Sequence, residues 1–281
     1  MASPARALRA LGAARRAPAG ATLVAVGVAA AAAVGLHFGT PRHVAVYLGT
    51  MALGVVVTDA AAAAPAAPLP VRRPARETTL LLAFAALGLL CGLLRTAWLP
   101  QAADVPGLVR LAIQLGALVF LLPIATAVAF ALWRYTPRDV GFRAHGLLVV
   151  PALVALFAAG GAAAGAGGWL WSRVLAEAGL GGLVVQGLLA GSTEEYFRLL
   201  VQTRLGALWR SPALGWLAAS LLWSVLHVPV HWKPDRPWVA VVGVFWSLPY
   251  GLLLGYVTHR TRSVVPALLV HTTNLWGLTG L

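Results

Sequence analysis

The chain has 281 residues, of which 60% are hydrophobic and only 10% are charged, and its mean hydropathy is +0.83. Such values lie far outside the range of soluble globular domains and indicate a protein that crosses a membrane several times. The 21 Lys and Arg residues outnumber the 8 Asp and Glu residues, but they are scattered between apolar runs without a nucleic-acid-binding motif, so we expect no nucleic acid as a partner.

The first segment, residues 1–20, is basic and rich in alanine and leads into an apolar stretch. It resembles a signal peptide, but no clear cleavage site follows it, and many more apolar runs come after it. We therefore interpret it as a cytoplasmic tail followed by a retained first helix.

Apolar runs of about 20 residues, the length that crosses a membrane as a helix, recur along the whole chain. The first two are Ala-rich and weakly hydrophobic, so an eight-span version, in which one of them lies on the membrane or only dips into it, is an alternative. The third contains the single cysteine, Cys91, whose lack of a partner excludes a disulfide. The predicted fold is an all-α bundle of eight or nine transmembrane helices, with nine candidate spans at about residues 22–38, 44–63, 79–98, 107–132, 146–170, 181–203, 212–231, 239–257 and 263–279.

The only evident linker is the basic, Ala/Pro-rich stretch 60–77. It divides the chain into an N-terminal tail and hairpin (1–78), a helical membrane region (79–175) and a C-terminal core (176–281). Of the 21 Lys and Arg residues, 14 fall on the N-terminal side of the nine spans, 6 on the other side and one, Arg198, inside a span. The positive-inside rule then predicts a cytoplasmic N-terminus. We expect a multi-pass protein of the inner or plasma membrane, in contact with its lipids.

Polar side chains inside the predicted spans are concentrated in the last third of the chain. Placing an ionisable group at membrane depth costs at least about 2.5–3.5 kcal/mol, so such groups by default face the interior of a bundle or a watery cavity. Earlier spans offer only His37 and Asp59, each near a predicted end. The later set comprises Glu194, Glu195, Arg198, His227, His271 and Asn274, with His231 at a span boundary.

Three of these residues lie in the stretch GSTEEYFR, residues 191–198. On a helix, Glu194, Glu195 and Arg198 share one face. One interpretation is an intrahelical ion pair between Glu194 and Arg198 at i,i+4. A single arginine does not neutralise two carboxylates, however, so the excess acid favours a general base.

Two histidines lie inside two later spans, His227 in WSVLHVPVHW and His271 in VVPALLVHTTNLWG. Each could be no more than a hydrogen-bonded contact between helices. Together with two glutamates on a third helix, they could also supply a base, an oxyanion donor or metal ligands. Asn274 shares a helix face with His271 and can orient a histidine, a water or a carbonyl. The nearby tryptophans, Trp223 among them, are interpreted as packing or membrane-interface residues.

The candidate residues can share one site only if they lie at similar depths in the membrane. Counted from the predicted inner boundaries, Glu194 and His271 lie about 12–14 Å deep and His227 about 22 Å deep. The mismatch shrinks if the sixth span continues to Arg210 or if Ser211 and Pro212 lie within the membrane. We expect one of these two arrangements.

These three patches, in this order on consecutive spans, resemble the CAAX protease and bacteriocin-processing (CPBP) family, the type II CAAX prenyl endopeptidase or Abi family. Its motifs are E-E-x-x-x-R, F-x-x-x-H and H-x-x-x-N. Here EEYFR stands for the first and WSVLH, with Trp223 in place of Phe, for the second, while RTRSVVPALLVHTTNL is similar to the lead into the last histidine. The resemblance covers residues 180–278. The first motif is one residue shorter here, which leaves Glu194 and Glu195 as alternatives for the base, and Asn274 stands at i+3 from His271.

The resemblance implies an intramembrane endopeptidase acting on a membrane-embedded or lipid-modified peptide. A glutamate, Glu194 or Glu195, would activate water, and His227 and His271 would stabilise the oxyanion. Arg198 and Asn274 would support them. The resemblance implies a metal-free mechanism, which the lack of an H-E-x-x-H helix supports weakly, so we expect no cofactor. The alternative is a zinc ion held by Glu194, His227 and His271.

Two other classes of function remain open from the sequence. One is a catalytically inactive membrane scaffold or immunity protein of the same fold, because the motifs are altered. The other is a proton-coupled transporter that uses the buried glutamates and histidines as a relay. Internal repeats or broken helices would favour transport, and we find no convincing repeat.

Overall fold

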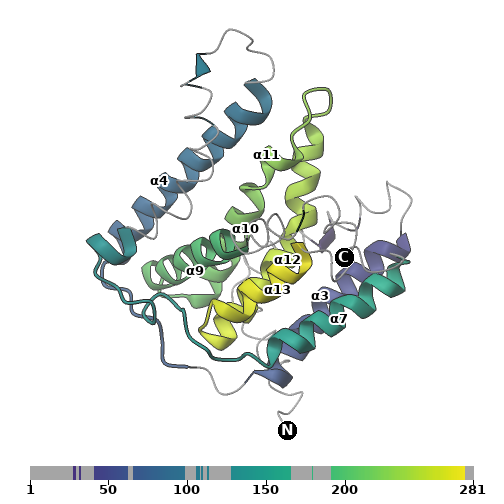
Figure 1. Ribbon diagram of the computed structural model, residues 1–281, viewed down its shortest axis with the longest axis horizontal. Coiled ribbons are helices and arrows are strands. Elements are labelled where there is room, and N and C mark those ends of the chain that lie inside the picture. Colours follow the sequence, from purple (N-terminus) through teal and green to yellow (C-terminus); the bar gives the residue numbers. More distant parts are fainter. Residues whose placement is uncertain are drawn as a thin grey trace.

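The computed structural model describes residues 41–62, 66–98, 128–165 and 191–275, with isolated positions at 28, 29, 32, 106, 107, 109, 113 and 179. Every regular element in these ranges is a helix, as the all-α prediction requires (Figure 1). The predicted span 22–38 and most of 107–132 lie outside the described residues. The elements are α3 (Pro41–Ala61), α4 (Pro74–Leu93) continued by η1 (Leu94–Trp98), η3 (Val128–Leu132), α7 (Val149–Ala164), α9 (Gly191–Leu208), α10 (Pro212–Val225), α11 (Val228–His231), α12 (Trp238–Thr261) and α13 (Val265–Leu275).

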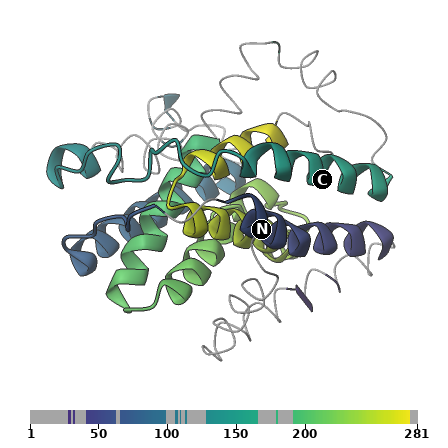
Figure 2. The same ribbon diagram turned by 90° about the horizontal axis from the view of Figure 1, so that it is seen from below.

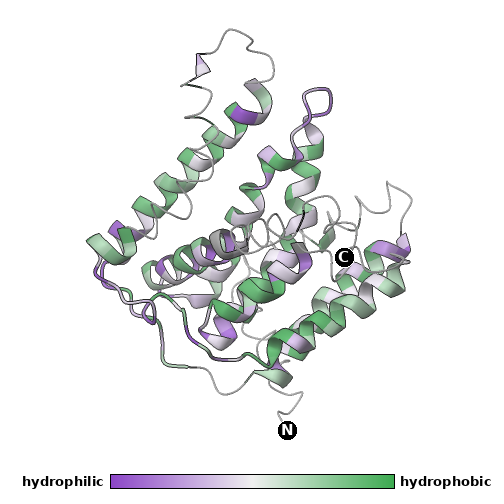
Figure 3. Ribbon diagram, in the orientation of Figure 1, coloured by the Kyte–Doolittle hydropathy of each residue, from purple (hydrophilic) through white to green (hydrophobic). Residues whose placement is uncertain are grey.

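Four stretches in the described ranges are long and apolar enough to cross a membrane: Pro41–Ala61, Pro74–Trp98, Pro212–His231 and Trp238–Thr261. They coincide with four of the predicted spans, at 44–63, 79–98, 212–231 and 239–257. Apolar residues cover much of the outward surface of α3 and α4 (Figure 3), where Leu53 and Leu90 are exposed. The total number of spans and the side of the N-terminus remain predictions.

Three further predicted spans, at 146–170, 181–203 and 263–279, correspond to helices whose described parts are shorter or more polar than expected. Helix α7 has 16 residues, and the described part of α13 has 11. Helix α9 has 18 residues but does not meet the hydropathy criterion of a span. Helices α3 and α7 lie side by side in both ribbon views (Figures 1 and 2).

Helix α9 occupies the centre of the C-terminal bundle, packed against α4, α10, α12 and α13. Its residues from Glu195 to Gln202 are all buried. Because protein surrounds it on every side, α9 can carry polar residues that a lipid-facing helix could not. The buried core around it includes Leu81 of α4 and Ala219 of α10.

The predicted linker 60–77 is shorter at both ends, because α3 continues to Ala61 and α4 begins at Pro74. Proline is favoured in the first turn of a helix, where no N–H donor is needed. The Glu77 carboxylate also accepts a hydrogen bond from the Arg73 backbone N–H at 2.9 Å. These two local features start the helix before the apolar run begins.

Helices α9 and α10 form a tight hairpin. Ser211 caps α10 by accepting a hydrogen bond from the Leu214 N–H at 3.3 Å. A Cβ atom on Gly215 would lie 2.4 Å from the Gly206 nitrogen, so two glycines allow the helices to approach each other closely. Helix α9 runs on to Leu208, in agreement with the expected continuation towards Arg210.

A second buried ion pair joins α4 to α9. Arg204 is fully buried, Glu77 is 2% exposed, and the Arg204 Nε atom donates to Glu77 Oε2 at 2.9 Å. The Tyr135 hydroxyl donates to Glu77 Oε1 at 2.9 Å. Arg204 is one of the 14 basic residues assigned from the sequence to the N-terminal side as loop charges; that assignment was wrong, since Arg204 is an interior residue with a partner.

Candidate active site

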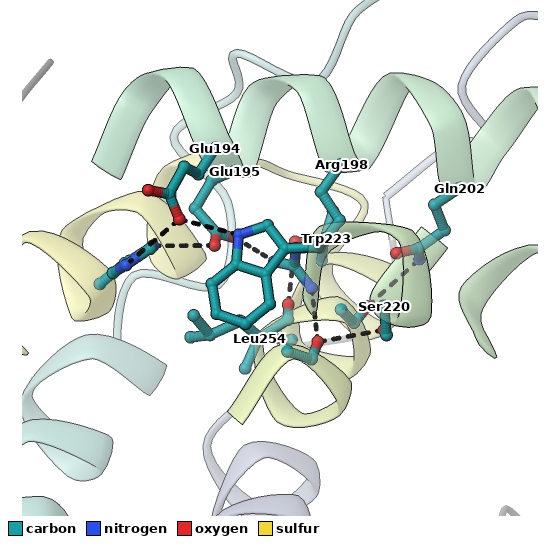
Figure 4. Close-up of polar contacts among 12 residues, drawn as sticks. Glu194, Glu195, Arg198, Gln202, Ser220, Trp223 and Leu254 are labelled. Carbon is teal, nitrogen blue, oxygen red and sulfur yellow. Dashed lines mark hydrogen bonds and ion pairs between the residues drawn. The ribbon is translucent and has the colours of Figure 1, made fainter. Parts of the chain in front are cut away.

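Helix α9 directs Glu194, Glu195 and Arg198 into the bundle (Figure 4). Arg198 and Glu195 are buried, and their side chains form an ion pair at i,i+3. Arg198 Nη1 also donates to the Gly251 carbonyl of α12 at 2.8 Å. The interpretation of Glu194 and Arg198 as an i,i+4 pair is therefore wrong, because the arginine is held by Glu195 and α12.

Two glycines of α12 make room for Arg198 and for Trp223. A Cβ atom on Gly255 would lie 2.6 Å from Arg198 Nη1, and one on Gly251 would lie 2.6 Å from the Trp223 ring. Small residues recur every fourth position along this face of α12, at Gly243, Ser247, Gly251 and Gly255. This spacing is typical of closely packed membrane helices and is a sequence signal for the contact.

The Glu194 carboxylate is the point at which the candidate residues converge. Its Oε2 atom accepts a hydrogen bond from Trp223 Nε1 at 2.9 Å. The same oxygen lies 3.4 Å from His227 Nε2 and 3.8 Å from His271 Nε2. The predicted proximity of Glu194 and His227 is thus found, and the expected mismatch in depth does not separate them.

Hydrogen bonds at the Nδ1 atoms fix the orientation of the two histidine rings relative to Glu194. His227 Nδ1 lies 2.8 Å from the Trp223 carbonyl, and since a carbonyl only accepts, this nitrogen carries the proton. His271 Nδ1 lies 3.0 Å from Glu195 Oε1. Each ring therefore turns its Nε2 atom towards the Glu194 carboxylate.

Glu194 and Glu195 differ sharply in their surroundings. The Glu194 side chain is 26% exposed, whereas Glu195 is 0% exposed and holds Arg198 with one oxygen and His271 with the other. Only Glu194 has an oxygen that reaches open space.

Two aromatic residues complete the site, and the sequence interpretation missed their roles. Trp223 is buried, donates to Glu194 and lies with its ring centroid 4.2 Å from that of His227. Tyr250 packs edge-on against His271 at 5.5 Å, and Asn274 lies beside the Tyr250 hydroxyl. The spacing of Trp223 and His227 at i,i+4 could have placed both on one face, so Trp223 was identifiable from the sequence as more than packing.

A small cavity of about 80 Å³ adjoins this cluster between α9 and α10. Its polar wall is formed by Glu194, Arg198 and His227. Such a volume accommodates water beside polar groups. The rest of the wall is mainly apolar, consisting of Phe197, Val201, Ala219, Leu222, Trp223, Leu226 and Val230.

The alternative of a zinc site can be tested on the donor atoms. Glu194 Oε2 approaches the Nε2 atoms of both histidines, but no group of three or more His, Cys, Asp or Glu side chains in the described ranges has the spacing of a metal site. The choice between a metal-free reaction and zinc stays a prediction.

Span-length apolar helices around a buried cluster of glutamate, histidine and arginine define a helical membrane protein with a polar site in its interior. Residues 176–276 match the family model of the type II CAAX prenyl endopeptidases, described as Rce1-like. The match confirms the resemblance to the CAAX protease family over this segment, which contains every candidate site residue from Glu194 to Asn274. No curated protein and no solved structure matches the chain.

Proposed function

We propose that this protein is an intramembrane endopeptidase of the CAAX type, with Glu194 as the base that activates water. The observation that carries the proposal is the convergence of one carboxylate oxygen, two histidine Nε2 atoms and an indole N–H beside a cavity. The family match of this segment supports the same class of reaction.

Glu194 fits the role of base better than Glu195. A general base must reach the proton that it removes, and Glu194 lines the cavity. Both oxygens of Glu195 are engaged, by Arg198 and by His271. Glu195 therefore positions His271 instead of reacting.

In the proposed reaction, a water molecule in the cavity loses a proton to Glu194 while its oxygen attacks the peptide carbonyl carbon. The carbonyl oxygen becomes an oxyanion, and an N–H at Nε2 of His227 or His271 donates to it. Because Nδ1 is already protonated, a ring that donates at Nε2 is an imidazolium. Glu194 then returns the proton to the amide nitrogen as the C–N bond breaks, giving a carboxylic acid and an amine. No step uses a metal.

The shape of the cavity favours a substrate with an apolar portion. Phe197, Val201, Leu222 and Leu226 form an apolar wall that leads to Glu194. A membrane-embedded segment or a lipid-modified peptide would bury its apolar surface there. Such a peptide is the proposed substrate.

Purified protein in lipid vesicles can be assayed on a prenylated peptide and on a transmembrane peptide. We expect Glu194→Gln to lower the cleavage rate by at least about 100-fold, and His227→Ala and His271→Ala to lower it too, while a chelator has no effect. Asp235→Asn, which alters a carboxylate that is 68% exposed, is the matched control. Cleavage that continues unchanged in Glu194→Gln would overturn the assignment of Glu194 as the base. If a chelator abolishes the activity and added zinc restores it, the reaction depends on zinc and the metal-free mechanism is wrong.

One alternative has an observation in its favour. The first motif is one residue shorter than that of the family. Asn274 stands at i+3 from His271 instead of i+4, and it lies beside Tyr250. Both departures favour a scaffold or immunity protein of the same fold. Absence of cleavage for both peptides by correctly folded protein would support this alternative.

A further inference from the structure

A second cavity, of about 460 Å³, lies at the end of the bundle where α9 stops. We call it the helix-end cavity. Its size lies within the range of small-molecule sites. Its walls come from the segment before α4 and from α9, α10 and the end of α12, and they include Gln202, Ala207, Pro212, His259 and Arg262.

The helix-end cavity lies at the level where membrane-spanning helices end. One span-length stretch starts at Pro212 and another ends at Thr261, and residues beside both ends line the cavity. The ends of transmembrane helices lie in the headgroup region. Lipid headgroups are therefore concentrated near its opening.

Arg262 gives this cavity a positive charge, and His259 beside it supplies a ring N–H that can donate a hydrogen bond. His259 and Arg262 line it, and no acidic side chain does so in the described part of the chain. The neighbouring Arg260 is paired with Asp59 at 2.9 Å, so that carboxylate is already engaged. Basic pockets between membrane helices bind anionic headgroups.

The inner wall of the cavity offers a hydrogen-bond acceptor. Gln202 is only 4% exposed, and its Nε2 atom donates to the Gly255 carbonyl at 3.2 Å. Its Oε1 atom is buried without a partner. A hydroxyl group from a ligand would satisfy this buried acceptor.

From the basic residues, the free acceptor and the position at the helix ends, we propose that the helix-end cavity binds a phosphate ester that also carries a hydroxyl group. The phosphate contacts Arg262 and His259, and the hydroxyl donates to Gln202. A glycerol phosphate has both groups, either as the headgroup of phosphatidylglycerol or as a free solute. This site is separate from Glu194 and is independent of the proposed protease activity.

Native mass spectrometry of the detergent-purified protein measures this binding directly, with phosphatidylglycerol, phosphatidylcholine and glycerol 3-phosphate as three separate probes. We expect phosphatidylglycerol to be retained in preference to phosphatidylcholine, and Arg262→Gln to weaken its binding about tenfold or more. Arg210→Gln is the matched control, because Arg210 and Arg262 both adopt positive φ, at 50° and 53°, but only Arg262 lines the cavity.

A second variant separates the cavity from surface charge. Ala207→Trp fills the space without changing any charge, and we expect it to weaken phosphatidylglycerol binding as Arg262→Gln does. Binding of glycerol 3-phosphate that is equally sensitive to Arg262→Gln would support the same site with a free solute as its ligand. Equal retention of both lipids, equal loss in Arg210→Gln, or unchanged binding in Ala207→Trp would overturn the proposal.

Discussion

Glu194 and Glu195 are adjacent in the chain but have opposite surroundings. Glu195 is enclosed by Arg198 and His271, whereas Glu194 reaches a cavity. A buried charge whose partner is removed is strongly destabilising, by about 3–5 kcal/mol. The two glutamates should therefore differ in what they contribute to stability.

We expect Glu195→Gln to lower the free energy of unfolding by about 3–5 kcal/mol, because Arg198 keeps its charge without a carboxylate partner. Glu194→Gln should lower it much less, since this side chain is partly exposed and the one amide oxygen of glutamine can still accept the hydrogen bond from Trp223. Denaturant unfolding in detergent micelles, followed by tryptophan fluorescence, measures both. Equal destabilisation by the two substitutions would contradict the assigned partners.

At the scale of single elements, α12 depends on small residues where it meets α9 and α10. A methyl group on Gly255 would lie within 3.0 Å of the Arg198 and Trp216 side chains. Overpacking of this kind costs about 1–3 kcal/mol. Gly49 of α3 has nothing within 4 Å of its added Cβ.

Gly255→Ala should therefore lower the thermal midpoint of unfolding in detergent. Gly49→Ala should keep or raise it, because alanine is favoured over glycine by about 1 kcal/mol inside a helix. The pair differs only in what surrounds the new methyl group. A similar change in midpoint for both variants would mean that α12 does not pack against Arg198 as described.

How far the sequence predicted each element depends on what surrounds it. The four span-length apolar stretches were found within a few residues, because crossing a membrane requires a continuous apolar run. Helix α9 was placed at 181–203 but its described part is 191–208, since protein buries it and hydropathy does not mark its ends. The convergence of Glu194, His227 and His271 followed from their motifs. The pairing of Glu77 with Arg204 had no local signal, since 127 residues separate them.

At the scale of the whole molecule, the ends of α4, α9, α10 and α12 define one face of the bundle. Arg204 of α9 contacts Glu77 in the first turn of α4, and Pro212 and Arg262 line one cavity. The loop that contains Asp235 lies at the other end of α12. The positive-inside rule predicts that the first face is cytoplasmic.

Single cysteines at positions 72, 210 and 235, each in a Cys91→Ala background, test this arrangement. In sealed inverted vesicles, a membrane-impermeant maleimide should label positions 72 and 210, whereas position 235 should react only after detergent is added. Labelling of 72 and 210 from opposite sides would contradict the relative placement of α4 and α9. Labelling of both only in right-side-out vesicles would contradict the predicted orientation.

The central position of α9 has a consequence for biosynthesis. When α9 leaves the ribosome, the partner of Arg204 has already been made, because Glu77 lies 127 residues earlier. The partners of Arg198 and Glu195 on later helices have not been made, since Gly251 lies 53 residues after Arg198 and His271 lies 76 residues after Glu195. The site therefore stays unassembled until α13, the last described helix, has been synthesised.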